Sequence, residues 1–211
     1  MANPPSGRSV KIDQDERGGW SSDRPRREGG ERPPDVSVRC HVLRPTELLR
    51  YSPGSLLLVV APVAADGERF VTRLIEERGA VLSIGKVREL ITGRVPEAEL
   101  DARAAELLEA AVAKRLGARE SVVVPTTALD GETRARFVLA AARQKRPRHL
   151  VLIEPPREAI DDDARGELNA LRRALESGAL GDEGFHTALR LGPATVGDVR
   201  RVVFRPPPSD D

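Results

Sequence analysis

The sequence is poor in aromatic residues and has almost no net charge. It contains four Phe, one Tyr and one Trp, and 34 basic residues face 33 acidic ones, for a net charge of +1. Surfaces that bind nucleic acids combine excess positive charge with aromatic rings that stack on bases. We therefore do not expect a nucleic-acid partner, and the charge balance gives no reason to expect an anionic membrane.

Cysteine and long apolar runs are also scarce. Cys40 is the only cysteine, which excludes an intrachain disulfide and leaves a thiolate metal cluster without enough ligands. The first ten residues lack the apolar core of a signal peptide, and the longest apolar run, 56–65, contains Pro62 and is too short to cross a bilayer. These absences predict a protein of the reducing cytoplasm with no membrane partner.

The abundant residues are Arg, Ala, Gly and Pro, a composition typical of a high-GC genome. Residues 1–35 combine Pro, Gly, Ser and balanced charge, with Val10, Ile12 and Trp20 as the only large apolar residues after Met1. Such a segment buries too little surface to offset its ordering entropy, so we predict a disordered tail. A docking segment around Trp20 is the alternative. We expect one α/β domain over 36–204 and a mobile Pro-rich end over 205–211.

Apolar patterning predicts strands that alternate with helices. Residues 36–42 alternate apolar and polar side chains, which indicates a half-buried strand with Cys40 in the core. A continuous apolar run over 55–60 is typical of a strand inside a parallel sheet. Further strands are predicted at 80–83, 121–124, 149–153 and 199–204, and helices at 68–79, 97–116, 131–145 and 157–177. This order predicts a three-layer α-β-α fold with a mainly parallel sheet.

The segment after the strand at 55–60 has the length and apolar frame of a phosphate-binding loop and its helix. It reads VVAPVAADGERFVTRL over 59–74, where such a loop would read G-x-x-x-x-G-K-[ST]. With this loop in place, residues 55–204 resemble the P-loop kinase-like domains related to polynucleotide kinase, many of which are described as AAA-family ATP-binding proteins. The resemblance implies a P-loop NTPase-like fold and an ATP-dependent kinase ancestry.

The residues that the resembled family uses to hold ATP are absent from this loop. Aligning the two loops places Ala61 at the first glycine, Asp66 at the second glycine, Gly67 at the lysine and Glu68 at the Ser or Thr. The lysine neutralises phosphate oxygens and the hydroxyl binds Mg²⁺, so two carboxylates here oppose both roles. The degenerate phosphate loop comprises Ala61, Ala64, Asp66, Gly67, Glu68 and Arg69.

The other kinase positions that the resemblance implies are also altered. Gly85 stands where the family has its general base, although Arg88 matches an acceptor-binding arginine. After the strand at 121–124, Thr127 and Arg134 match the family, but we expect them instead to cap the next helix and to pair with Asp130 or Glu132. The lid helix carries three aspartates, 161–163, which point in different directions and do not form a metal site.

We therefore expect a non-catalytic P-loop kinase-like domain that acts as a protein-interaction or assembly module. It would have no catalytic residue, no cofactor and no metal, and its partner would be another protein or a second copy of itself. The alternative is a nucleotide-binding phosphotransferase, a polynucleotide or small-molecule kinase, with a rearranged site. In that alternative Arg69, Arg88 or Arg134 replaces the missing lysine.

Overall fold

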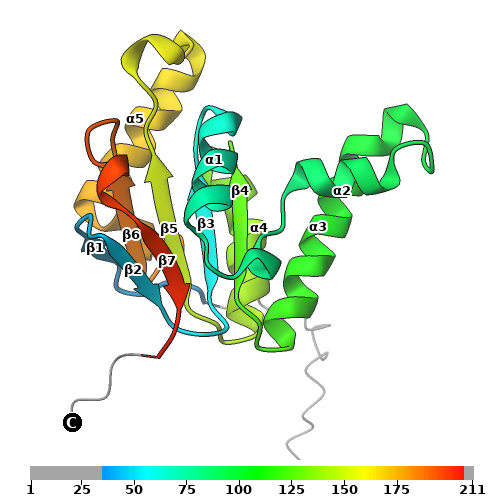
Figure 1. Ribbon diagram of the computed structural model, residues 1–211, viewed down its shortest axis with the longest axis horizontal. Coiled ribbons are helices and arrows are strands. Elements are labelled where there is room, and N and C mark those ends of the chain that lie inside the picture. Colours follow the sequence, from blue (N-terminus) through cyan, green and yellow to red (C-terminus); the bar gives the residue numbers. More distant parts are fainter. Residues whose placement is uncertain (1–34, 207–211) are drawn as a thin grey trace, which may run out of the picture. The chain divides into compact units, whose positions relative to one another are not determined.

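A computed structural model describes residues 35–206 of the chain (Figure 1). The predicted disordered tail over 1–35 lies outside the described residues except for Asp35, and so does the Trp20 docking alternative. Of the predicted mobile end, only Arg205 and Pro206 are described.

Five parallel strands form the main sheet. Their order is β1-β6-β5-β3-β4, so β3, which precedes the predicted phosphate loop, is flanked on both sides. A separate parallel pair, β2-β7, completes the strands of the described residues. The strands are β1 His41–Leu43, β2 Leu48–Tyr51, β3 Leu56–Val60, β4 Val122–Thr126, β5 Arg148–Ile153, β6 Thr187–Leu191 and β7 Arg201–Phe204.

Helices connect β3 to β4, β4 to β5 and β5 to β6, as parallel pairing requires, whereas the chain passes from β1 to β3 through β2. The α-helices are α1 Ala64–Leu74, α2 Ile84–Ile91, α3 Leu100–Gly117, α4 Gly131–Arg143 and α5 Asp162–Ser177. Short 3₁₀ turns lie at Arg78–Ala80, Glu97–Glu99, Arg157–Ala159, Ala179–Gly181 and Val196–Asp198. A mainly parallel sheet with connecting helices confirms the predicted α/β class.

Two hydrophobic clusters cover the two faces of the sheet. On one face, alternate residues of β3, β4 and β5 pack against α3, α4 and α5, with Leu58, Val124 and Leu168 among them. On the other face, the intervening residues pack against α1 and against β2 and β7. Figure 1 shows α1 and the β2-β7 pair in front of the sheet and α4 behind it. One outer layer is therefore part helix and part strand, where helices alone were expected.

Several predicted elements differ from the structure. The strand predicted at 36–42 is regular only at β1: its alternating burial runs from Val36 through Cys40, but Val42 is 48% exposed. The strand predicted at 80–83 is replaced by a 3₁₀ turn and a single bridge between Val81 and Val123. This segment lies at the edge of the sheet next to β4, and Ser83 ends it by capping α2.

Two strands and one helix were not predicted at all. β2 lies between the strands predicted at 36–42 and 55–60, and β6 lies between the last predicted helix and the last predicted strand, where no element was predicted. α2 was missed although Ile84, Val87 and Ile91 follow a helical spacing, because the helix is only eight residues long. The last predicted strand, 199–204, is present as β7, but it pairs with β2 and not with the main sheet.

The carboxyl ends of β3 and β4 meet at one edge of the sheet because the two strands run parallel in register, Val60 beside Thr126. Ligands bind at this edge in open α/β folds. The connections that follow these strands therefore form the first place to look for a site. Within 35–206, no helix combines the length and apolar character that crossing a membrane requires.

Candidate functional site

The connection between β3 and α1 is only three residues long. Residues 61–63 join the strand to a helix that begins at Ala64, and the backbone N–H of Asp66 already donates to the Val63 carbonyl at 3.0 Å. In a phosphate-binding loop, this part of the chain curves so that successive backbone N–H groups face the phosphates. Here the residues aligned with the second half of that loop are helical.

Gly67 has a packing role at the position aligned with the missing lysine. It is buried in α1, and a Cβ added to it would lie 3.2 Å from the Ala61 Cβ and 3.9 Å from the Pro125 Cβ. The glycine thus lets α1 approach the ends of β3 and β4 closely. An added Cβ would require Ala61 to move by a small distance.

The charged residues of α1 do not form a cationic site. Asp66 lies in the first turn and pairs with Arg69 at 3.2 Å, and the Arg69 side chain is 72% exposed. Glu68 is half-buried and has no ion-pair partner among the residues that the structure describes. The Arg69 guanidinium is therefore engaged by Asp66, whereas the Glu68 carboxylate is not engaged by a cation of the described chain.

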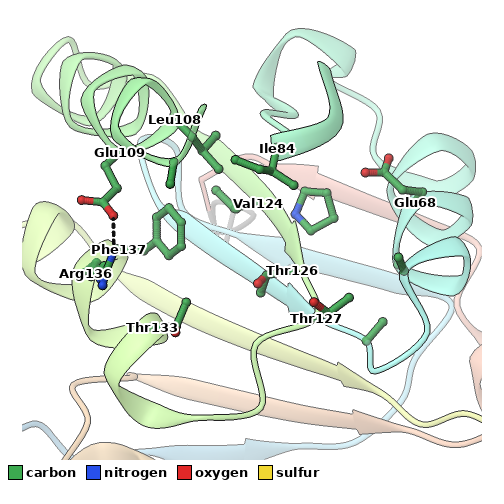
Figure 2. A pocket seen from close by; sticks show the side chains of 15 residues that line it. Glu68, Ile84, Leu108, Glu109, Val124, Thr126, Thr127, Thr133, Arg136 and Phe137 are labelled. Carbon is green, nitrogen blue, oxygen red and sulfur yellow. Dashed lines mark hydrogen bonds and ion pairs between the residues drawn. The ribbon is translucent and has the colours of Figure 1, made fainter. Parts of the chain in front are cut away.

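A cavity of about 230 Å³ lies beside this connection (Figure 2). Its walls come from the start of α1, the carboxyl end of β4, and α2, α3 and α4. They are mostly apolar, and Figure 2 shows Ile84, Leu108, Val124 and Phe137 around the hollow. The lining residues are Ala61, Ala64, Gly67, Glu68, Ile84, Ala105, Leu108, Glu109, Val124, Pro125, Thr126, Thr127, Thr133, Arg136 and Phe137.

The polar residues of the cavity are few. Glu109 of α3 and Arg136 of α4 form an ion pair at 3.4 Å, so their charges compensate each other (Figure 2). The Thr126 hydroxyl accepts a hydrogen bond from the Ala128 N–H at 3.1 Å, while Thr127 is exposed. Glu68 is thus the uncompensated charge among the lining residues.

Four of the six degenerate-loop residues, Ala61, Ala64, Gly67 and Glu68, line this cavity, and so does Thr127. Asp66 and Arg69 do not line it. Sequence reasoning did not find the opposite wall. The amphipathic pattern placed Leu108 on the inner face of a helix, but nothing in that pattern distinguishes a residue that packs in the core from one that faces a hollow. Ile84 belongs to the helix that was missed.

Two of the predicted polar candidates lie elsewhere. Arg88 of α2 pairs with Asp101 of α3 at 3.0 Å and does not line the cavity. Arg134 is only 3% exposed: it binds both carboxylate oxygens of Glu183 at 2.7 to 3.0 Å and donates to the Leu129 carbonyl at 2.5 Å. The predicted pairing of Arg134 with Asp130 or Glu132 is therefore wrong. Asp130 caps α4 instead.

The segment over 157–177, for which the resemblance implies a lid helix, has arginines as well as the expected aspartates. Arg165 and Arg172 of α5 line a second hollow, of about 310 Å³, with Arg157 and Asn169. Arg165 pairs with Asp162 at 2.6 Å, and Arg172 donates to the carboxylate of Glu154 at 2.5 Å. Arg165, Asn169 and Arg172 have the spacing of one helix face, which is the sequence signal that could have indicated this cluster. Within 35–206, no group of three or more His, Cys, Asp or Glu side chains could hold a metal ion.

Part of the chain matches a known protein family. Residues 69–166, just under half of the chain, match the model of a family described as "AAA domain". The chain contains a P-loop kinase-like domain. The match to the family model begins at Arg69, directly after the residues aligned with the phosphate-loop motif.

The chain is also similar to a crystal structure of a proposed kinase from Chloroflexus aurantiacus J-10-fl. The identity is 16% and the TM-score 0.38, over 67% of this chain and 86% of the other. The search of curated proteins gave no match. The strand order and the family match support the P-loop kinase-like fold.

Proposed function

We propose that this P-loop kinase-like domain does not bind Mg-ATP and acts as a protein-interaction or assembly module of the cytoplasm. The observation that carries the proposal is the helical conformation from Ala64 onward. Because the Asp66 N–H bonds to Val63, the backbone donor at the position of the second glycine is directed into the helix and away from a ligand.

Electrostatics supports the same conclusion. A triphosphate needs cations to neutralise its charge, and kinases supply Mg²⁺ and a lysine for this purpose. Asp66 and Glu68 bring two carboxylates to the start of α1, and Arg69 already pairs with Asp66. A phosphate in this place would meet net negative charge.

The size and chemistry of the cavity favour an apolar group over a nucleotide. Pockets for drug-sized ligands occupy about 300–1,000 Å³, whereas this one has about 230 Å³ and mostly apolar walls. Protein interfaces commonly place one large side chain of a partner in a pocket of this kind. The cavity supports an anchor position for another protein or for a second copy of the chain.

The structure gives little support to the rearranged phosphotransferase. That alternative needs Arg69, Arg88 or Arg134 to replace the lysine, but all three are held in ion pairs, and Arg134 is buried against Glu183. The assay that tests it is transfer of radiolabelled phosphate from ATP to nucleosides, short oligonucleotides and aminoglycoside-like compounds. Transfer above background would contradict the proposal.

The interaction role is tested by blocking the cavity. Ala105 lines the cavity from α3, and Ala110 lies on the same helix on an exposed face. A partner captured by the full chain should be retained by Ala110→Phe and lost by Ala105→Phe. Equal capture by both variants would show that the cavity is not the interaction site.

A further inference from the structure

We propose that the cavity beside α1 accepts an aromatic side chain of a partner protein that is flanked by Lys or Arg, with Glu68 pairing to the flanking cation. This inference rests on the proposed function, because it assumes that the cleft holds a protein group and not a nucleotide. It adds the chemistry of that group.

The walls select an apolar ring. Ile84, Leu108, Val124 and Phe137 surround the hollow from four different elements, so a group placed there has apolar contacts on several sides (Figure 2). Aromatic side chains bury about 150–250 Å² each and gain further from ring-to-ring contact, which Phe137 offers. A volume of about 230 Å³ accommodates one such side chain rather than several.

The charge of the lining selects a neighbouring cation. The cavity has three charged lining residues, and two of them, Glu109 and Arg136, compensate each other at 3.4 Å. The third, Glu68, is half-buried and has no partner within the described part of the chain. A half-buried carboxylate gains from a cation that is brought to it in a bound complex.

The helix N-termini near the cavity do not reverse this preference. α2 and α4 begin there, but the Ser83 hydroxyl accepts from the Lys86 N–H at 3.4 Å and the Asp130 carboxylate accepts from the Thr133 N–H at 2.7 Å. At the start of α1, Asp66 already supplies the negative charge that a helix N-terminus favours. An acidic partner segment would thus meet carboxylates.

Four blocked pentapeptides separate the contribution of the aromatic ring to the affinity from that of the flanking charges. Three contain a central tryptophan flanked by two lysines, two glutamines or two glutamates, and the fourth contains a central alanine flanked by lysines. Dissociation constants come from NMR titration of the labelled full chain. We expect the lysine-flanked tryptophan peptide to bind about two- to fivefold more tightly than the glutamine one, the glutamate one to bind most weakly of the three, and the alanine peptide not to bind.

Two variants assign these effects to the cavity. Glu68→Gln should remove the difference between the lysine and glutamine peptides and leave the affinity for the glutamine peptide unchanged. Ala105→Phe should abolish binding of all peptides, whereas Ala110→Phe should bind as the wild type does. Thermal unfolding of each variant establishes that it is folded.

The contrary results are distinct from those that would overturn the proposed function. If no tryptophan peptide bound, if the glutamate peptide bound as well as the lysine one, or if Ala105→Phe bound normally, this inference would be wrong. Mg-ATP added to the same protein tests the proposed function separately, since nucleotide binding would overturn that proposal whatever the peptides do.

Discussion

Gly67 occupies the position at which a phosphate-binding loop has its lysine. Restoring that residue alone should not restore nucleotide binding, because the surrounding chain is helical and Asp66 and Glu68 flank the position. The new side chain would also have to displace Ala61 slightly, since the added Cβ lies 3.2 Å from the Ala61 Cβ. We predict that Gly67→Lys gives no detectable heat with Mg-ATP in calorimetry. Tight binding by this variant would show that the rest of the pocket is intact.

Two ion pairs on α4 should differ greatly in their contribution to stability. Glu183 pairs with Arg134, which is 3% exposed, whereas Glu109 pairs with Arg136 at the surface. Glu183→Gln leaves a buried guanidinium without its counter-charge, so we expect the free energy of unfolding to fall by about 3 kcal/mol. Glu109→Gln should cost less than about 1 kcal/mol. Urea unfolding of both variants measures this, and equal losses would contradict the assignment.

His149 makes the fold sensitive to acid. Burial lowers its pKa from 6.5 to about 3, with smaller contributions from the positive charges of His186 and Arg148. Its Nδ1 lies 2.8 Å from the Thr187 hydroxyl, but its Nε2 is buried without a hydrogen-bond partner within 35–206. Adding a proton therefore places an uncompensated charge between the main sheet and Tyr51, whose ring centroid is 4.6 Å away.

The direction of the pH effect follows from these two pKa values. Between about pH 6.5 and about pH 3, the unfolded chain binds a proton at His149 and the folded chain does not. The free energy of unfolding should therefore fall as the pH falls through this window, and it should be unaffected by this group above it. We expect His149→Phe to lose less stability than the wild type over the same range, in urea titrations at several pH values. Parallel curves would contradict the prediction.

At the scale of elements, the N-caps of α4 and α5 allow the stability contribution of a capping hydrogen bond to be compared with that of a cap without one. Both helices have an aspartate N-cap, but only Asp130 accepts a hydrogen bond, from the Thr133 N–H at 2.7 Å, and that bond lowers its pKa. Asp161 makes no side-chain cap bond. We predict that Asp130→Ala lowers the free energy of unfolding by about 1 kcal/mol, and Asp161→Ala by much less. A similar loss in both variants would refute the distinction.

The elements that could be predicted are those whose pattern is local and strong. β3 is a run of fully buried apolar residues, and α3 carries a stripe that includes Leu108, Val112 and Leu116. β2 was missed because only two of its four residues are buried and its partner, β7, lies about 150 positions away in the sequence. Strand pairing of this kind depends on tertiary contacts that a short window does not contain.

At the scale of the molecule, the position of the site could be predicted and its composition only in part. The connection after β3 is at the cavity, as the parallel topology required, and five of the predicted candidates line it. Arg134 was expected to pair nearby in the sequence, yet its partner Glu183 lies 49 positions away. The apolar wall of the cavity comes from α2, α3 and α4. It depends on how these helices pack together, which a comparison of single residues with a motif cannot predict.

Calorimetric titration of the purified full chain with ATP and excess Mg²⁺ tests the central claim most directly. The account predicts no binding heat, because α1 begins at Ala64, directs the Asp66 N–H into the helix and places the Glu68 carboxylate, without an ion-pair partner among the described residues, beside the connection. Binding with micromolar affinity would contradict it and would show that the connection between β3 and α1 opens to take a nucleotide.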